Sequence, residues 1–231
     1  MPYVFTPAAT VSVPVVGHDD QFPVHRIYCV GRNYVEHAQE MGHSGREAPF
    51  FFMKPADAVL VAPADTTVAM PYPSLTANLH HEIELVVAIG VGGTDIKAAD
   101  AAKHIYGYAV GLDMTRRDLQ SDMKKQGRPW CIGKGFDYSA PIGPITPADQ
   151  VPDIGNAAIH LQVNSQERQR STVAKLIWNI AETIEQLSAA WTLQAGDLIF
   201  TGTPEGVGAV VRGDTLVGRI DGLQGISVRM E

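Results

Sequence analysis

The chain has 231 residues, of which 45% are hydrophobic and 19% are charged, and its formal net charge is -7. A chain of this length accommodates one domain with a sizeable core and does not require two. The acidic balance argues against nucleic acid as a partner, because phosphate binding needs clustered Lys and Arg. The opening segment lacks the pattern of an export signal, and no apolar run reaches the roughly 18 residues that span a bilayer. Neither export nor membrane insertion is therefore expected.

The chain contains two cysteines, Cys29 and Cys131. They are too few for a structural zinc site and do not form a CxxC redox pair. The sequence therefore favours a reducing, cytoplasmic location. Cys29 lies in an apolar run and is interpreted as a small buried hydrophobic residue.

Short runs with the composition of β-strands recur along the chain, and Gly and Pro separate them. Many strands and few helices predict an α+β, mainly β fold. No linker-like stretch divides the chain, so we expect a single domain over residues 25–231, with residues 1–24 as an N-terminal extension packed on it. The predicted strands cover residues 26–30, 50–53, 82–89, 108–112, 159–163, 197–201 and 225–230.

Four helices are predicted from capping and periodicity. Asn33 is a good N-cap and Glu36 follows it by three residues, as in a capping box. Thr115 and Asp118 repeat the same pattern before the third helix. The longest helix is predicted from apolar residues at helical spacing, which indicate core packing. The predicted helices cover residues 33–42, 97–104, 116–126 and 172–190.

Three acidic residues form the first candidate site. A strand over residues 82–89 places Glu82 and Glu84 on the same face, while its other residues are apolar. Asp113 ends another apolar run, at a position where a site can form. Carboxylates that close repel one another in a partly buried site unless a cation or a basic side chain neutralises them. The pattern therefore predicts a divalent metal held by Glu82, Glu84 and Asp113.

An all-oxygen ligand set favours Mg²⁺ or Mn²⁺, with water and substrate completing the coordination shell. His80 and His81 precede Glu82 directly and keep a zinc site open as an alternative. A second alternative has no metal, with Glu82 and Glu84 paired to Lys or Arg on an edge strand.

His37 and Glu40 are three residues apart on the first predicted helix and therefore share a face. A carboxylate in this position can orient an imidazole, so the pair is a candidate general base with its orienting acid. A His and a Glu at this spacing are also common as solvated residues of an exposed helix.

Four further polar side chains are candidate substrate contacts. Lys54 follows the apolar run of residues 50–53, and Lys134 lies between two glycines, so either ammonium can stabilise a developing oxyanion. Arg117 can bind a carboxylate and Gln120 a keto oxygen, and the two share a helix face. Surface lysines and an ordinary polar helix face are the alternatives, and Arg116 can take the place of Arg117.

A glycine-rich turn follows the predicted strand over residues 197–201. Its glycines permit close approach of the backbone, and Thr203 offers a hydroxyl group. The segment lacks the spacing and the ending of a phosphate-binding loop, so taken alone it is only a turn.

Together these segments resemble the fumarylacetoacetate hydrolase family, and specifically its acylpyruvate-hydrolysing branch. The match spans roughly residues 26 to 230, and its pieces occur in the family's order. They are Gly31–Tyr34 with His37 and Glu40, Phe52–Pro55, His80–Glu84, Leu112–Thr115 with Arg117 and Asp118, Lys134–Asp137, Gly196–Asp197 and Thr201–Pro204.

The resemblance implies a mixed β-roll with a few peripheral helices, usually assembled as a homodimer. It also implies Mg²⁺ or Mn²⁺ on the three carboxylates and a catalytic pair of His37 and Glu40. The other residues become substrate or oxyanion contacts: Lys54, Lys134, Arg117, Gln120 and Thr203. One departure is Gly133, where the family pattern has Ala, and it is expected to loosen the placement of Lys134.

The implied activity is hydrolysis of a small 2-keto-acid substrate, with fumarylpyruvate cleaved to fumarate and pyruvate, as in gentisate-type aromatic degradation. Arg32 and Arg128 are candidates for binding the far carboxylate. The alternatives are oxaloacetate decarboxylation, isomerisation of a dienoate, a non-catalytic protein that binds 2-keto acids through the metal, and a purely structural acidic protein.

Overall fold

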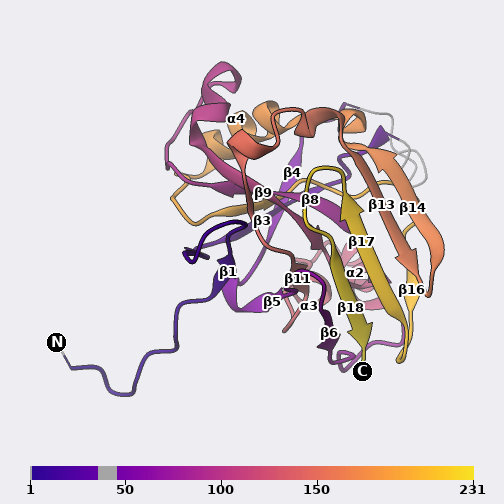
Figure 1. Ribbon diagram of the computed structural model, residues 1–231. Coiled ribbons are helices and arrows are strands. Elements are labelled where there is room, and N and C mark those ends of the chain that lie inside the picture. Colours follow the sequence, from indigo (N-terminus) through magenta and orange to yellow (C-terminus); the bar gives the residue numbers. More distant parts are fainter. Residues whose placement is uncertain (1, 36–45) are drawn as a thin grey trace.

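An eight-stranded mixed sheet lies at the centre of the molecule (Figure 1). The structure is a computed structural model that describes residues 2–35 and 46–231. Within these residues, the sheet is ordered β4 (Phe50–Lys54), β3 (Ile27–Gly31), β15 (Leu198–Phe200), β8 (Ile83–Ile89), β9 (Ile105–Leu112), β11 (Ala140–Ile142) and β5 (Val59–Val61), and β12 (Thr146–Pro147) pairs with β9.

A second sheet packs against β8 and β9 and closes the main core. Core residues from both sheets belong to one apolar cluster, so the two sheets bury each other's inner faces. In the described part of the chain its order is β14 (Gln166–Thr172), β13 (Ala158–Val163), β17 (Thr215–Ile220), β18 (Ile226–Met230) and β6 (Thr67–Met70).

Strand β8 is buried on both of its faces. Leu85 and Val87 belong to the main core, whereas Val86 and Ala88 belong to a second apolar cluster on the opposite face. This division follows from the alternation of side chains along a strand, and it explains the nearly continuous apolar run in the sequence. Glu84 shares the face of Val86, so the apolar strand carries one carboxylate toward the second cluster.

The second cluster is covered by a hairpin near the N-terminus, β1 (Ser12–Pro14) paired with β2 (Gln21–Pro23). Val13 and Phe22 of this hairpin are buried. Before it, the chain extends away from the body, and the side chains of Tyr3, Val4 and Phe5 are exposed (Figure 1).

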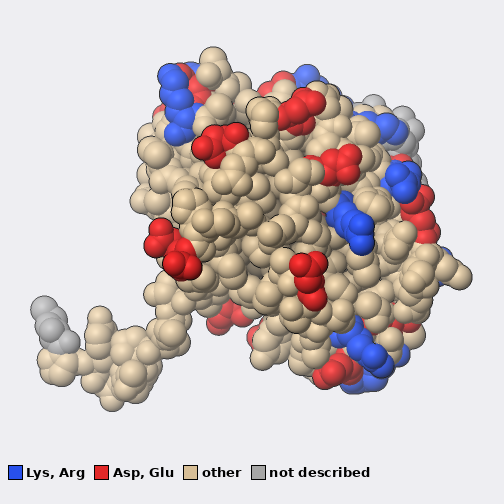
Figure 2. Space-filling view, in the orientation of Figure 1, with Lys and Arg blue, Asp and Glu red and all other residues tan. Residues whose placement is uncertain are grey.

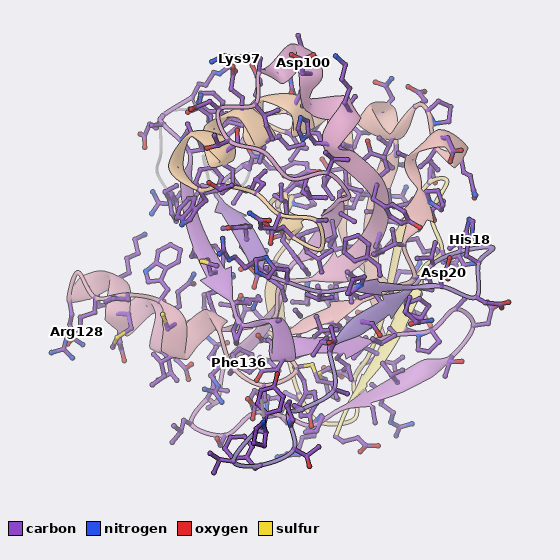
Figure 3. The ribbon with its side chains drawn as sticks, turned by 90° about the vertical axis from the view of Figure 1, so that its left-hand side faces the viewer. His18, Asp20, Lys97, Asp100, Arg128 and Phe136 are labelled. Carbon is purple, nitrogen blue, oxygen red and sulfur yellow. The ribbon has the colours of Figure 1, made fainter. Side chains whose placement is uncertain are left out.

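The remaining elements lie around the two large sheets. Helices α2 (Arg117–Lys125) and α3 (Cys131–Lys134) pack on each other and project from the body. Arg128 lies at the outer tip of this projection, and Phe136 lies where the chain returns (Figure 3). In the described residues, a small sheet is ordered β10 (Thr115–Arg116), β7 (Leu79–His81) and β16 (Gly208–Val210). The helices are α2 (Arg117–Lys125), α3 (Cys131–Lys134), α4 (Ile180–Ala190), and the 3₁₀ segments η1 (Ala56–Ala58), η2 (Ala98–His104), η3 (Ala148–Gln150), η4 (Ile154–Asn156) and η5 (Val173–Lys175).

The surface carries charges of both signs. On the face seen in Figure 2, Lys and Arg side chains are interspersed with Asp and Glu. Among the residues that the structure describes, no helix is long and apolar enough to cross a membrane.

The predicted mainly β fold is confirmed, and each predicted strand coincides with an observed one to within three residues at either end. The longest predicted helix is wrong in its first half, because α4 begins only after Asn179, whose capping box with Glu182 is complete. Upstream of this cap, the backbone bonds to a distant segment instead: the amide of Ile177 donates to the Asn33 carbonyl, and that of Trp178 to the Asn33 side chain. These tertiary bonds stop the helix from extending over residues 172–178.

The third predicted helix exists as α2, but its predicted capping box is wrong. Thr115 pairs with His80 in the small sheet, and Lys134 donates to its hydroxyl. Asp118 accepts instead from Thr76 and from the amide of Ala77. The first predicted helix lies largely outside the described residues.

Candidate active site and metal centre

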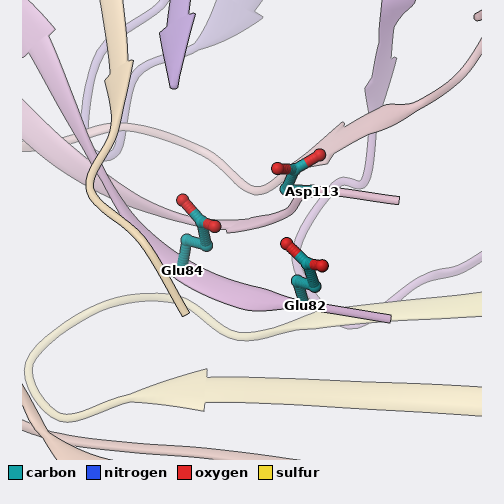
Figure 4. Close-up of side chains that lie close together, drawn as sticks. All are labelled: Glu82, Glu84 and Asp113. Atoms are coloured by element: carbon teal, nitrogen blue, oxygen red, sulfur yellow. The ribbon is translucent and has the colours of Figure 1, made fainter. Parts of the chain in front are cut away.

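Three carboxylates meet where β8 begins and β9 ends (Figure 4). Glu84 lies on β8 and Asp113 follows β9. The sequence predicted Glu82 inside a strand, but it lies between β7 and β8. The amide of Asp113 donates to the Glu82 carbonyl at 2.9 Å, which fixes the two turns beside each other. One oxygen of each residue lies within 4.8 Å of the others, and all three side chains are buried.

Glu84 has the strongest electrostatic reason to bind a cation. Burial, followed by the charges of Asp113 and Glu82, raises its pKa well above the usual range. Its Oε2 atom accepts a hydrogen bond from the Gly202 amide at 2.7 Å, which partly opposes that rise. A divalent cation would remove the repulsion among the three groups, so the donor set fits Mg²⁺ or Mn²⁺.

Two buried lysines contact Asp113. The Lys134 ammonium donates to Glu82 at 2.8 Å, to Asp113 at 2.6 Å and to Thr115 at 2.7 Å. Burial lowers the pKa of Lys134, but the charges of Asp113 and Glu82 outweigh it and raise the pKa overall. Lys54 lies 2.8 Å from the other Asp113 oxygen. Lys134 is therefore held firmly, contrary to the expectation that Gly133 loosens it.

Gly133 has a different role, which is to bring α2 and α3 together. A Cβ atom at this position would lie 2.9 Å from the backbone nitrogen, Cα and Cβ of Gln120. The absence of a side chain therefore permits the close approach that places Gln120 at the site.

Arg117 connects helix α2 to the carboxylates. Its guanidinium bonds to Glu82 and donates to the Gln120 side-chain oxygen at 2.6 Å. Arg116 points elsewhere, because its guanidinium lies over the Phe136 ring at 4.4 Å. The structure thus brings Arg117, and not Arg116, to the site.

The two histidines are engaged outside the carboxylate cluster. His80 bonds to Asn78 at 2.9 Å, and His81 bonds to Gln169 at 2.9 Å. Burial, assisted by the charge of Arg117, lowers the pKa of His80 to about 4, and burial also lowers the pKa of His81. Within the described residues the metal-type cluster contains carboxylates alone, so the zinc alternative is not supported.

The alternative that Glu82 and Glu84 pair with Lys or Arg on an edge strand is wrong about the strand. Strand β8 is a central strand, flanked by β15 and β9. Glu82 does pair with a lysine and an arginine, but in a buried cleft and not on an exposed edge.

The glycine-rich turn after β15, which contains Gly202 and Thr203, also borders the site. Gly202 has φ of 101°, and a Cβ there would lie 2.8 Å from the Asn33 side chain, so only glycine fits. The Asn33 amide donates to the carbonyls of Trp178 and Thr201 and ties three segments together. The buried Thr203 follows this turn and lines the cleft.

Gln169 on β14 determines how the Thr203 hydroxyl is oriented. Its oxygen accepts from the Ile83 amide at 3.1 Å, so its nitrogen must face the other way. That nitrogen donates to the Pro204 carbonyl at 2.9 Å and to Thr203 Oγ1 at 2.8 Å. Thr203 accepts this bond, and its own proton has no acceptor among residues 2–35 and 46–231.

A cleft of about 420 Å³ opens from the carboxylates. One wall is aromatic, since Trp130 contacts Phe50 and Phe52 with ring centroids 5.3 and 5.8 Å apart. Another part of the lining comes from α2. The cleft is lined by Val30, Gly31, Arg32, Phe50, Phe52, Glu82, Glu84, Asp113, Arg117, Gln120, Ser121, Lys124, Lys125, Trp130, Lys134 and Thr203.

Most of the predicted site residues line this cleft. Lys54 does not, because it lies behind Asp113 and also donates to two backbone carbonyls, those of Met114 and Lys134. Arg128 does not either, and it lies at the outer tip of the α2 and α3 projection (Figure 3). His37 and Glu40 lie outside the described residues.

Sequence reasoning missed Thr115, Ser121, Lys124, Trp130 and Gln169. Helical spacing from Arg117 could have found Ser121 and Lys124, which lie four and seven residues further on the same face. No local signal marks Gln169, which acts through a strand distant in sequence.

Comparison with known proteins identifies the class to which this site belongs. Residues 26–230 match the family model described as fumarylacetoacetate (FAA) hydrolase C-terminal. The chain belongs to the fumarylacetoacetate hydrolase family. This membership and the relatives below confirm the expectation of a hydrolase that acts on carbon–carbon bonds.

Three relatives place the chain more narrowly. A fumarylpyruvate hydrolase of a Ralstonia species is 48% identical over 182 residues, which are 79% of this chain and 92% of the relative. The mitochondrial oxaloacetate tautomerase of Rattus norvegicus is 40% identical over 205 residues, 89% of this chain and 91% of the relative. The crystal structure of fumarylpyruvate hydrolase from Pseudomonas aeruginosa with Mn²⁺ and pyruvate has a TM-score of 0.97 at 58% identity, covering 99% of both chains.

Proposed function

We propose that the protein hydrolyses acylpyruvates in a metal-dependent reaction, with fumarylpyruvate cleaved to fumarate and pyruvate. The observation that carries this proposal is the buried cluster of Glu82, Glu84 and Asp113 at the base of a cleft lined by cationic and aromatic side chains. The similarity to fumarylpyruvate hydrolases supports the choice of substrate.

Glu82, Glu84 and Asp113 are the residues proposed to hold Mg²⁺ or Mn²⁺. When bound, the metal supplies a Lewis acid for the 2-keto-carboxylate end of the substrate, which stabilises the enolate of the leaving pyruvate. The raised pKa of Glu84 supports this assignment, because that carboxyl group is the one most in need of a positive neighbour.

Each polar side chain of the cleft receives a role from its position. Arg117 and Gln120 are proposed to bind the carboxylate and keto oxygens of the pyruvyl end. Thr203 donates its free hydroxyl proton to the same carboxylate. Lys134 lines the cleft and already donates to Glu82, Asp113 and Thr115, so it is proposed to stabilise the oxyanion on the acyl carbonyl through its positive charge.

Lys54 is proposed to act through Asp113, without contacting the substrate. It lies 2.8 Å from Asp113 Oδ1 and is fully buried behind it. Its role is therefore to keep Asp113 ionised and correctly placed, which makes it a positioning residue.

The hydrolytic step needs a base, and the resemblance assigns this role to His37 held by Glu40. His37 removes a proton from water, and the hydroxyl adds to the acyl carbonyl carbon. The bond to the pyruvyl carbon then breaks, and its electron pair becomes the pyruvate enolate. Protonation of the enolate carbon completes the reaction, so water, fumarylpyruvate, fumarate and pyruvate balance.

The test follows the ultraviolet absorbance of fumarylpyruvate, acetylpyruvate and oxaloacetate with the wild type and a His37→Ala variant. We expect Mg²⁺-dependent loss of fumarylpyruvate by the wild type and a loss of at least about 100-fold in the variant, the scale of general base catalysis. Near-full activity of the variant would remove His37 from the mechanism.

Oxaloacetate tautomerisation is a second candidate, favoured by the relative that is 40% identical over 205 residues. It uses the same enolate stabilisation but breaks no carbon–carbon bond. Turnover of oxaloacetate alone would select this activity and keep the metal site.

A homodimer in the cytoplasm stays a prediction from the sequence and the resemblance. Sedimentation of the purified protein and fractionation of cells measure these two properties directly.

A further inference from the structure

The cleft extends well beyond the three carboxylates. Helix α2 forms one wall, from Arg117 beside Glu82 to Lys124 near its C-terminal end. With a rise of 1.5 Å per residue, these two positions are about 10 Å apart along the helix axis. Side chains on a helix lean toward its N-terminus, so Arg117 and Lys124 lean the same way and keep this separation.

The spacing of residues on α2 places cations on the cleft side. Arg117, Gln120, Ser121 and Lys124 follow one another at i, i+3, i+4 and i+7, so they form one stripe. Of the two acids in the helix, Asp118 is bound to Thr76 and Ala77 on another side.

In the second acid, Asp122, the Oδ1 atom lies 3.9 Å from Lys125 Nζ. Lys125 is therefore already paired. Lys124, in contrast, forms no ion pair with any residue in the described ranges 2–35 and 46–231. Within these ranges the Lys124 ammonium has no acid beside it and can bind a ligand.

The aromatic part of the lining is suited to a planar, apolar segment of a ligand. Phe50 and Phe52 pack on Trp130 and present ring surfaces to the cleft. The Arg32 guanidinium lies over the Phe50 ring, 5.3 Å from its centroid, so positive charge also lies beside this wall. A conjugated carbon chain can lie against the aromatic rings, while the carboxylates at its two ends meet the cationic side chains of the cleft.

Length also fits such a ligand. In fumarylpyruvate six bonds separate the two carboxylate carbons, and an extended chain of six bonds spans about 7 Å by ordinary backbone geometry. The helix spacing exceeds this length by about 3 Å, a difference that the flexible four-carbon stem of Lys124 can bridge. A ligand whose acyl group ends in methyl reaches neither Ser121 nor Lys124.

We propose that Lys124, with the Ser121 hydroxyl beside it, is a subsite for a distal carboxylate and makes the cleft selective for acylpyruvates with a dicarboxylic skeleton. This inference rests on the proposed function and adds the residues that select its substrate. Neither residue is needed for cleavage itself, because both lie away from the carboxylate cluster.

The test compares kcat/KM for fumarylpyruvate and acetylpyruvate at saturating Mg²⁺. Lys124→Met keeps the length of the side chain and removes its charge. We expect a loss of about 10-fold with fumarylpyruvate, as for one charge-assisted hydrogen bond, and a change below about twofold with acetylpyruvate. Lys124→Glu should lower the fumarylpyruvate value further and again leave acetylpyruvate unchanged.

Lys97→Met is the matched control, because Lys97 is also exposed and lies far from α2 (Figure 3). Equal losses with the two substrates, or no loss with fumarylpyruvate, would overturn the subsite. If the wild type hydrolyses neither substrate, the proposed function fails instead. Calorimetric binding of the same two compounds with Mg²⁺ then decides the subsite, which requires weaker binding of fumarylpyruvate alone in Lys124→Met.

Discussion

At the scale of one residue, the burial of Glu84 lowers the stability of the metal-free protein and favours metal binding. It lies on an otherwise apolar strand, and its pKa is raised well above normal by burial and by two neighbouring carboxylates. A buried carboxylate in this setting destabilises the metal-free fold and is useful only when a cation is bound.

The variant Glu84→Gln should therefore separate folding from metal binding. The amide keeps the shape of the side chain and the bond from Gly202, so the metal-free protein should be as stable as the wild type or more stable. Affinity for Mn²⁺ should fall at least about 100-fold, since even outer-shell changes cost 10- to 100-fold. Thermal unfolding and calorimetry measure the two effects, and retained affinity would exclude Glu84 as a ligand.

Gln169 offers a second residue-scale prediction. In Gln169→Glu the donor to Thr203 is lost, and the Thr203 hydroxyl turns its proton toward the new carboxyl group and away from the cleft. We expect KM for fumarylpyruvate to rise about 10-fold with little change in kcat. Gln166→Glu, at an exposed position of the same strand, is the control. A change in kcat alone would contradict this role.

At the scale of elements, helix α2 is positioned by contacts in its N-terminal half. Gly133 allows α3 to approach it near Gln120, and Asp118 attaches it to the segment around Thr76. Because α2 carries Arg117, Gln120 and Lys124, a small displacement of the helix changes the whole wall of the cleft.

Substituting Gly133→Ala should displace α2. The added methyl group would lie 2.9 Å from the Gln120 backbone, and overpacking of this kind costs about 1–3 kcal/mol. We expect a lower free energy of unfolding and a higher KM. Gly155→Ala is the matched control, because a Cβ there meets no atom within 4 Å. Equal effects of the two substitutions would argue against a specific role for Gly133.

Asp118 gives a pH dependence with a defined sign. Although burial opposes it, hydrogen bonds from Thr76 and from the amides of Ala77 and Leu119 lower its pKa below 3.8. A carboxyl group whose pKa is lower in the folded state stabilises the fold above its unfolded pKa, and this contribution is lost as pH falls through the folded value. Asp118→Asn should thus reduce stability at pH 7 and lose this effect below pH 3.8. Urea unfolding at both pH values measures it, and a pH-independent effect would contradict the assignment.

The sequence predicts the strands and the three carboxylates well, because alternation and isolated acids in apolar runs are local signals. It predicts the ends of helices poorly. The predicted cap Thr115 is used by a distant partner, and the backbone of residues 177–178 bonds to Asn33 instead of forming a helix. The link from Gln169 to Thr203 depends on strands that meet only in the folded chain.

At the scale of the whole molecule, the site lies where the two apolar clusters meet. β8 divides them, so Glu82 and Glu84 emerge at the end of a strand that is buried on both faces. The packing of two sheets and a covering hairpin holds the carboxylates in place, and ion pairs with Lys54, Lys134 and Arg117 offset their mutual repulsion. A rigid surrounding core is what allows such a cluster to persist for a metal.

The central claim is metal-dependent hydrolysis of an acylpyruvate, and release of pyruvate from fumarylpyruvate tests it most directly. The account predicts equal amounts of fumarate and pyruvate with Mg²⁺, arrest of the reaction by a chelator, and recovery when Mg²⁺ or Mn²⁺ is restored. Pyruvate release that continues at full rate after chelation, or absence of cleavage with the metal present, would contradict the account.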